Sequence, residues 1–226
     1  MGKLLVIEGL DGSGKATQTR LLCSKLEQLG VRYRHITFPD YNDPSSTLVK
    51  MYLGGELGGV GDVNAWAASL FYAVDRYASF VRHWQQDYEE DTIIVADRYA
   101  TSNIPHQMSK LPKERWEEYL SWQKDLEYNR VGIPKPDLVL YLDMPPEVSK
   151  KLISGRYQGN EAKRDIHEAD FAYLLNCRQA ALFGAAHEGW QVVPCAQDHQ
   201  PLPPQAIANT IWQYVTRSLN LSADLV

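Results

Sequence analysis

The sequence predicts an α/β fold in which a five-stranded parallel sheet carries helices on both faces. Three observations predict this fold class. Short apolar segments alternate with longer helix-like segments along the chain, as in parallel sheets whose strands are joined through helices. The first apolar segment runs into a glycine-rich turn and then a helix. Polar residues follow the other apolar segments, at the edge where α/β sheets bind ligands.

The individual elements follow from local patterns in chain order. The first strand, residues 3–9, is an apolar run that ends in glycine. The helix that follows has leucines at roughly helical spacing and stops at Gly30. The other strands are predicted over residues 32–39, 92–99, 136–144 and 190–195, and the helices over residues 15–30, 64–89, 113–129, 146–155, 170–188 and 203–219. Residues 155–170 are polar and contain glycines, which predicts a mobile connection.

Composition bounds the class of protein. We expect one domain over residues 1–226, because this length suits a single α/β unit and 44% of the residues are apolar. The net charge of −5 argues against binding a nucleic acid polymer. The three cysteines form neither a disulfide framework nor a zinc pattern, and the first apolar run is too short to span a membrane. The cytoplasm is the expected location.

The turn after the first strand has the spacing of a phosphate-binding loop, Gly9-x-x-x-x-Gly14-Lys15. Glycines let the backbone turn its N–H groups toward an anion, and a helix N-terminus adds partial positive charge. Lys15 would reach the outer phosphates of a nucleotide. The predicted ATP-binding residues are Gly9, Leu10, Asp11, Gly12, Ser13, Gly14, Lys15, Ala16 and Thr17.

Ala16 departs from the usual loop pattern, which has a hydroxyl at this position to ligate Mg²⁺. A methyl group cannot ligate a metal. Mg²⁺ would then depend on phosphate oxygens, water and a carboxylate elsewhere. Asp97 is the candidate metal ligand, because it lies at the end of the third strand, at the edge where ligands bind.

Two further pairs of residues suit a nucleotide. Arg98, beside Asp97, could grip a phosphate with two parallel hydrogen bonds. Tyr72 and Arg76 lie four residues apart on a predicted helix and so share one face. This aromatic ring and this cation could stack a base and hold its phosphate, although a core aromatic covered by an arginine is the more ordinary arrangement.

Together these motifs resemble the thymidylate kinase family. The resemblance rests on "EGLDGSGK", on "FP" after the second strand, on an aromatic residue four before Arg76, on "DRY" followed by Ser102 and Gln107, and on "PDLVLYLD". It extends from residue 3 to about residue 195. It implies a P-loop NTPase fold of the nucleotide kinase type, transfer of the γ-phosphoryl group of ATP to dTMP to give dTDP, a requirement for Mg²⁺, and a homodimer.

The resemblance also implies roles for individual residues. Lys15, Arg98 and Asp97 would be catalytic, with Lys15 on the β- and γ-phosphates and Asp97 near Mg²⁺. Arg76 and Arg98 would hold the dTMP phosphate, and Tyr72 would stack on thymine. The remaining substrate-binding residues implied by the family are Asp11, Phe38, Pro39, Ser102, Asn103, His106, Gln107 and Glu168.

A lid over about residues 155–168 is implied as well. The phosphate loop lacks an arginine between Asp11 and Lys15, and family members built this way use lid arginines in catalysis. Arg156 and Arg164 are therefore the expected catalytic lid residues, and Glu168 belongs to the same "RDIHE" segment.

Three departures keep alternatives open. Besides Ala16, Pro105 and His106 replace the family's usual alanine and tyrosine, and that tyrosine helps to exclude a ribose 2′-hydroxyl. The run "DYNDPSS" after the second strand contains no phosphate-binding arginine. One alternative is a kinase for another nucleoside monophosphate or for a nucleoside, with Glu8 as its base. Another is an ATP-binding protein with impaired catalysis.

Overall fold

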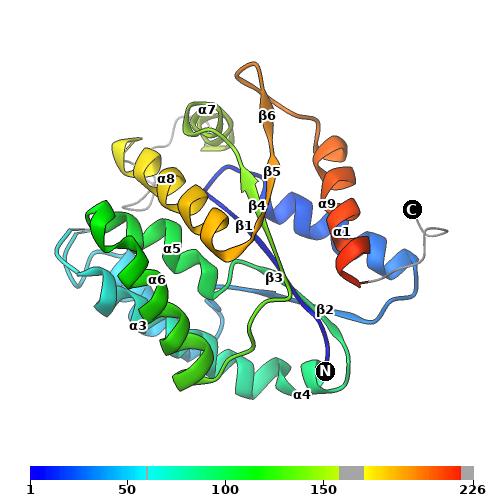
Figure 1. Cartoon of the computed structure of the whole chain (residues 1–226), viewed down its shortest axis with the longest axis horizontal. Helices are drawn as coiled ribbons and strands as arrows, with labels where there is room; N and C mark the ends of the chain where they lie inside the picture. Colours follow the sequence, from blue (N-terminus) through cyan, green and yellow to red (C-terminus); the bar gives the residue numbers. More distant parts are fainter. Residues whose placement is uncertain (60, 158–170, 220–226) are drawn as a thin grey trace.

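The computed structural model describes residues 1–59, 61–157 and 171–219, and its core is the predicted parallel sheet (Figure 1). Five strands pair in parallel in the order β2-β3-β1-β4-β5. They are β1 (Leu4–Gly9), β2 (Tyr33–Thr37), β3 (Ile93–Asp97), β4 (Leu138–Asp143) and β5 (Gln191–Pro194). All five predicted strands are confirmed. A small antiparallel hairpin of β6 (Ala196–Gln197) and β7 (Gln200–Pro201), which the sequence did not predict, follows β5.

Helices cover both faces of the sheet. Helices α1 and α9 lie on one face, and α3, α5, α6 and α8 lie on the other (Figure 1). The helices are α1 (Lys15–Gln28), α2 (Thr47–Leu53), α3 (Ala65–Ser79), α4 (Gln85–Glu89), α5 (Asn103–His106), α6 (Trp116–Lys124), α7 (Pro146–Tyr157), α8 (Phe171–Glu188) and α9 (Pro204–Leu219). Short 3₁₀ turns at Pro44–Ser46, Ala100–Ser102, Met108–Lys110 and Lys113–Arg115 connect some of them.

The alternation of side chains along β1 explains why two layers of helices are needed. Leu4 and Val6 belong to the apolar core under α3, α6 and α8, whereas Leu5 and Ile7 belong to the core under α1 and α9. Successive strand residues point to opposite faces. A strand that is apolar at every position is therefore stable only when both faces are covered.

Two predicted helices contain wide, π-helical turns. The predicted helix over residues 64–89 is continuous but passes through a π-helical segment, Phe80–Trp84, between α3 and α4. The predicted helix over residues 113–129 ends in another, Asp125–Val131, which terminates at Gly132 in the left-handed conformation (φ 80°). Such turns are rare and occur often at functional sites. The second one carries a residue that matters for the site below.

The predicted lid lies mostly outside the described residues. Residues 155–157 continue helix α7 rather than beginning a separate connection. Arg156 therefore belongs to the end of α7, although its side chain is outside the described part of the chain, as are Arg164 and Glu168. No helix within the described ranges is both long enough and apolar enough to cross a membrane.

Candidate active site

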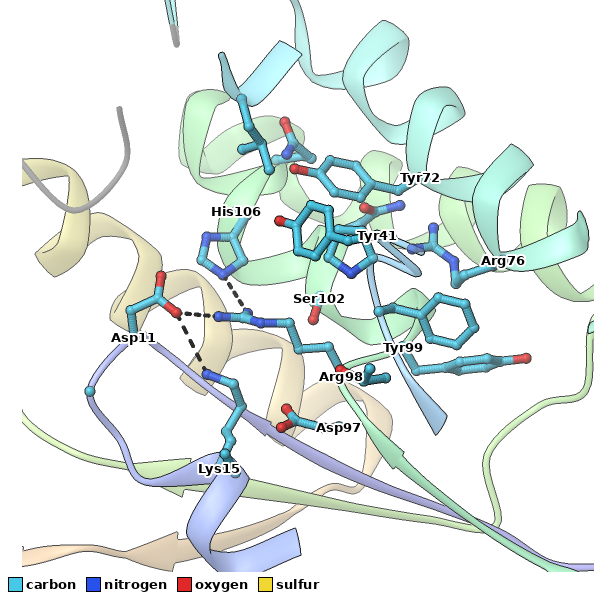
Figure 2. Close-up of a pocket in the computed structure, with 18 of the residues that line it drawn as sticks. Asp11, Lys15, Tyr41, Tyr72, Arg76, Asp97, Arg98, Tyr99, Ser102 and His106 are labelled. Carbon is cyan, nitrogen blue, oxygen red and sulfur yellow. Dashed lines mark hydrogen bonds and ion pairs between the residues drawn. The ribbon is translucent and has the colours of Figure 1, made fainter. Parts of the chain in front are cut away.

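One cavity of about 360 Å³ opens at the carboxyl ends of β1, β2 and β3. Most of the predicted site residues line it, although they come from separate parts of the chain. They are Asp11, Gly12, Gly14, Lys15, Ala16, Thr17, Phe38, Pro39, Tyr72, Arg76, Asp97, Arg98, Ser102, Asn103, His106 and Gln107. The loop and the two arginines thus share one cavity, with Arg98 between Lys15 and Arg76 (Figure 2).

The phosphate loop at one end of the cavity has the backbone that anion binding needs. Gly14 adopts the left-handed conformation (φ 90°) and begins α1 without a side-chain cap, so the first N–H groups of this helix are available to an anion. Gly9 is needed for close packing, because a Cβ there would lie 2.5 Å from Ser13 Oγ and 3.1 Å from the Leu142 carbonyl oxygen. Gly9, Leu10 and Ser13 shape the loop but do not line the cavity.

The Lys15 ammonium turns back over this loop. Its Nζ donates hydrogen bonds to the carbonyl oxygens of Gly9 (2.9 Å) and Leu10 (3.1 Å) and lies 3.8 Å from Asp11 Oδ1. Burial, aided by the nearby Arg98 cation, lowers the pKa of Lys15 to about 8. With this pKa the amine is still mostly protonated near neutral pH, and a polyphosphate bound at the adjacent helix N-terminus would stabilise its charged form further.

Arg98 occupies the centre of the cavity. Its Nη2 donates to Asp11 Oδ1 at 2.5 Å, and its Nη1 donates to His106 Nε2 at 3.0 Å (Figure 2). Because arginine can only donate, His106 accepts through an unprotonated Nε2. Burial alone would lower the pKa of Arg98, but the Asp11 and Glu8 carboxylates raise it. Arg98 therefore stays a cation at any physiological pH.

Asp97, at the end of β3, is half-buried and lies between Lys15 and Arg98 (Figure 2). Among the residues that the structure describes, no group of three or more His, Cys, Asp or Glu side chains is arranged to hold a metal. Mg²⁺ does not need one, because it usually keeps its waters and binds substrate phosphates with one or two carboxylates. The single carboxylate of Asp97 beside the phosphate loop fits that kind of site.

The far end of the cavity is built for a planar ring. The half-buried Tyr72 is held edge-on against Tyr52, with ring centroids 6.4 Å apart. Phe38 and Tyr99 contact each other on another wall, with centroids 5.9 Å apart. Arg76 lies at this end in Figure 2, away from the phosphate loop. A base could stack on Tyr72 with its polar edge toward Arg76.

Arg76 is already paired with a carboxylate. Its Nε donates to Glu127 Oε2 at 3.3 Å and its Nη2 contacts Glu127 Oε1. Both side chains are almost completely buried, with Arg76 at 1% and Glu127 at 0% exposure. Burial by itself would lower the pKa of Arg76, and the adjacent Glu127 carboxylate raises it. Sequence reasoning missed Glu127, because a single glutamate in a helical pattern normally faces solvent.

Glu8 is a fully buried carboxylate that contacts Ser102, one of the residues that line the cavity. Glu8 accepts hydrogen bonds from the Ser102 hydroxyl (2.8 Å), the Thr101 hydroxyl (2.6 Å) and the Tyr99 amide (3.2 Å). Burial raises the pKa of Glu8, and Glu8 does not line the cavity. This placement speaks against Glu8 as the base of a nucleoside kinase. It supports a role for Glu8 in shaping the backbone after β3.

Sequence reasoning also missed four lining residues: Thr37, Tyr41, Leu53 and Tyr99. Tyr41 belongs to the run after Phe38-Pro39 that lacks an arginine, and its ring reaches the cavity (Figure 2). The buried Asp75 fixes this run, since its carboxylate accepts from the Asp40 amide (2.9 Å) and the Ser45 hydroxyl (2.7 Å). Asp75 is next to Arg76 in sequence, but its contact with the run that carries Tyr41 can be recognised only once the fold is known.

A family model described as thymidylate kinase matches residues 7–200, most of the chain. The chain belongs to the thymidylate kinase family. It is 29% identical over 189 residues to the thymidylate kinase of Mycobacterium tuberculosis (strain CDC 1551 / Oshkosh), a match that covers 83% of this chain and 87% of that protein. It is also 29% identical over 196 residues to the thymidylate kinase of Danio rerio, covering 87% of this chain and 84% of the relative.

A solved structure of thymidylate kinase from Candida albicans has the same fold. It superimposes with a TM-score of 0.68 over 97% of this chain and 93% of that one, at 22% identity. The predicted fold of the nucleotide kinase type is thus confirmed. As a member of the thymidylate kinase family, the protein is a phosphotransferase that carries out the ATP-dependent phosphorylation of dTMP.

Proposed function

We propose that dTMP binds across the cavity with its phosphate at Arg98 and its thymine between Tyr72 and Arg76, facing ATP on the phosphate loop. The observation that carries this proposal is the continuity of the cavity. It joins Lys15, Arg98 and Arg76 in that order, with a wall of aromatic rings at the Arg76 end. A nucleoside monophosphate has its anionic and planar groups separated in the same way.

The donor end would hold the ATP phosphates through main-chain N–H groups and Lys15. The uncapped N-terminus of α1 and the residues from Gly12 to Thr17 that line the cavity support this assignment. Lys15 would exchange its contacts with the Gly9 and Leu10 carbonyls for contacts with phosphate oxygens. Ala16 contributes only a methyl group at this end.

The two arginines would have different partners, which revises the expectation that both hold the acceptor phosphate. A dianionic phosphate at Arg76 would compete with the Glu127 carboxylate, which is fully buried and would lose its cationic partner. Arg98 pairs instead with Asp11, which is 27% exposed and belongs to the loop. Asp11 can yield to a phosphate more easily, so Arg98 is the better phosphate ligand and Arg76 the better partner for the base.

Mg²⁺, when bound with ATP, would neutralise charge on the phosphates. Asp97 would hold it, directly or through water, since this carboxylate lies beside the loop and the family generally uses this metal. The predicted lid arginines Arg156 and Arg164 and the lid residue Glu168 stay predictions, because their side chains lie outside the described part of the chain.

The transfer itself needs positioning more than covalent chemistry. An oxygen of the dTMP phosphate attacks the γ-phosphorus of ATP in line, and the bond from that phosphorus to the β,γ-bridging oxygen breaks, leaving ADP and dTDP. The attacking phosphate is already anionic at neutral pH, so no general base is required. Lys15 and Arg98 would neutralise the charge that gathers on the transferred group and on the leaving oxygen.

A coupled assay of ADP release with ATP, Mg²⁺ and a panel of acceptors tests the proposal. We expect dTMP to give the highest kcat/KM among dTMP, dUMP, dCMP, dGMP and UMP, and thymidine to give none. Comparison of dTMP with its ribose analogue tests whether His106 still excludes a 2′-hydroxyl. Release of ADP with thymidine but not with dTMP would contradict the assignment, and so would ATP binding without any acceptor-dependent turnover.

We also propose that the protein is a homodimer in the cytoplasm. Four apolar side chains, Leu70, Val74, Tyr77 and Val81, are 45%, 53%, 49% and 49% exposed along one face of α3 and the π-helical turn that follows it. We expect the same stripe of a second copy of the chain to pack against this one and cover it. The three cysteines are buried free thiols, as in proteins of a reducing compartment.

A further inference from the structure

Glu127 is a fully buried carboxylate that the reaction itself does not use. It lies on the π-helical turn Asp125–Val131, and its backbone carbonyl accepts hydrogen bonds from the Gly132 amide (3.0 Å) and the Ile133 amide (3.1 Å). This wide turn directs Glu127 to the base end of the cavity, where it meets Arg76 and Asn103. We propose that Glu127 is a positioning residue that fixes the hydrogen-bond pattern by which this site selects the thymine edge, by turning Arg76 into an oriented donor and Asn103 into an oriented acceptor.

The contact with Arg76 uses only part of the guanidinium. Glu127 takes the Nε–H and one N–H of Nη2, and a guanidinium has five N–H donors in a rigid fork. The remaining donors are held in the plane that the carboxylate sets. Arg76 lines the cavity, so we assign these remaining donors to the group of a base that reaches this end.

The contact with Asn103 decides which way its amide points. Asn103 Nδ2 lies 3.4 Å from Glu127 Oε1. A carboxylate accepts hydrogen bonds, so it favours the side-chain amide nitrogen of Asn103 on its own side. The side-chain oxygen of Asn103 is then left for the cavity, which Asn103 lines. Gln107 also lines the cavity, and in the described part of the chain its buried Oε1 has no hydrogen-bond partner. The base end therefore offers a cationic donor beside amide oxygens.

This pattern matches one class of pyrimidine and mismatches the other. Thymine presents an acceptor at O4 and a donor at N3–H, whereas cytosine presents a donor at N4 and an acceptor at N3. A cytosine would place its amino group against Arg76 and its ring nitrogen against an amide oxygen. Buried polar groups left unpaired in this way are the strongest means of rejecting an analogue. This hydrogen-bond pattern makes no contact that depends on the thymine methyl group, so uracil would satisfy it equally well.

A buried ion pair is weak evidence for stability, because hydrophobic residues of similar volume are often as stabilising. A role in orienting the Arg76 guanidinium explains better than stability why a buried ion pair stands at this place. The inference rests on the proposed function, since it names how the base of the acceptor is chosen. Turnover of dTMP and dCMP by the wild-type enzyme is measured first, and a wild-type enzyme without dTMP turnover would refute the proposed function rather than the role of Glu127.

The test is the variant Glu127→Gln, which keeps the shape and removes the charge. We expect the ratio of kcat/KM for dTMP to kcat/KM for dCMP to fall by about tenfold or more, the scale of one lost directional contact. The loss with dTMP should be mainly in its KM, and the KM for ATP should change by less than about twofold, because the donor end is separate. An unchanged dTMP-to-dCMP ratio would overturn the proposal.

The matched control is Gln123→Met, one turn earlier on the same helix. Gln123 is also buried, and its Nε2 donates to the Ala100 carbonyl (3.0 Å), so this variant loses a buried hydrogen bond without touching Arg76 or Asn103. We expect it to lower the melting temperature and leave the dTMP-to-dCMP ratio unchanged. An equal fall in the ratio for both variants would mean that Glu127 acts only through stability.

A second variant covers the case in which Glu127→Gln does not fold. Glu127→Asp keeps the charge that Arg76 needs but withdraws the carboxylate by one methylene from both partners. We expect folded protein, by circular dichroism, with a reduced dTMP-to-dCMP ratio. A ratio equal to that of the wild type in this folded variant would contradict the proposal.

Discussion

At the scale of single residues, Arg98 combines a functional side chain with an unfavourable backbone. Its φ is 67°, in the left-handed region that residues other than glycine seldom occupy. Such a conformation costs about 1–2 kcal/mol for an L-residue. It places the guanidinium between Asp11 and His106 in the middle of the cavity. The strain thus falls on the residue that the proposed mechanism needs most, as strain often does.

Two substitutions separate the side chain of Arg98 from its backbone. Arg98→Ala and Arg98→Gly both remove the guanidinium, so both should reduce transition-state binding, measured from kcat/KM for dTMP, by about 2–5 kcal/mol. Only glycine also removes the φ penalty, so Arg98→Gly should be more stable to urea than Arg98→Ala by about 1 kcal/mol. Equal stabilities would show that the backbone at residue 98 is not strained, and unimpaired turnover would refute its role.

Lys15 predicts a pH dependence of nucleotide binding. With its pKa lowered to about 8, Lys15 is protonated below pH 8 in the free protein and neutral above it. Bound phosphates raise this pKa, so ATP binding above pH 8 must take up a proton, and affinity should weaken by up to about tenfold per pH unit there. Calorimetry at pH 8.5 in buffers of different ionisation enthalpy measures the proton uptake.

A second lysine supplies the control for this pH dependence. Burial lowers the pKa of Lys110 to about 8 as well, but its Nζ donates to the Tyr52 hydroxyl (2.6 Å) and the Val63 carbonyl (3.2 Å) rather than facing the loop. Lys110→Met should therefore keep the proton uptake, and Lys15→Met should abolish it. Uptake that survives in Lys15→Met would assign the effect to another group.

Ala16 allows a test of the metal site. It is exposed at the start of α1 and lines the cavity, where a hydroxyl would reach a metal on the phosphates. Ala16→Ser should lower the Mg²⁺ concentration for half-maximal activity by roughly threefold or more, because it adds a ligand to a site that otherwise has one carboxylate. An unchanged Mg²⁺ requirement would count against Asp97 as the compensating ligand.

At the scale of elements, regular segments could be predicted from sequence and irregular ones could not. The five strands and the long helices followed from apolar periodicity and glycine stops, because burial against the sheet demands those patterns. The sequence did not predict the roles of Glu127 and Tyr41 in the site. Glu127 depends on a π-helical turn, and Tyr41 lies in a run with no periodic pattern. Tertiary contacts decide both placements. The phosphate loop and Arg98 were predictable because each follows a regular strand directly, and Tyr72 because it lies on a long regular helix.

The irregular run after β2 is positioned by hydrogen bonds to a residue of another element, helix α3. Asp75, on α3, accepts from the Asp40 amide and the Ser45 hydroxyl and so fixes the segment that carries Tyr41 into the cavity. Asp75→Ala would leave these donors unpaired, at a cost of about 1–3 kcal/mol in the free energy of unfolding. We also expect a higher KM for dTMP with an unchanged KM for ATP. A change confined to stability would show that the position of Tyr41 does not matter to the substrate.

At the scale of the whole molecule, the apolar stripe on α3 predicts assembly. Val74 lies in its middle and is 53% exposed. Val74→Lys should convert a dimer into a monomer in sedimentation equilibrium, since a buried unpaired ammonium costs several kcal/mol at each symmetric contact. Leu175→Lys is the control, because Leu175 is a similarly exposed apolar residue on α8. A wild-type monomer, or dissociation by both variants, would contradict the proposed interface.

The cavity also joins two structural layers of the molecule, the edge of the sheet and the helices above it. The loop, Asp97 and Arg98 are fixed to the edge of the sheet, whereas Tyr72, Arg76, Asn103 and Glu127 belong to the helical layer above it. A new nucleobase preference could therefore be engineered by rebuilding α3, α5 and the turn at 125–131, with the sheet edge kept intact as a reusable module for phosphate chemistry.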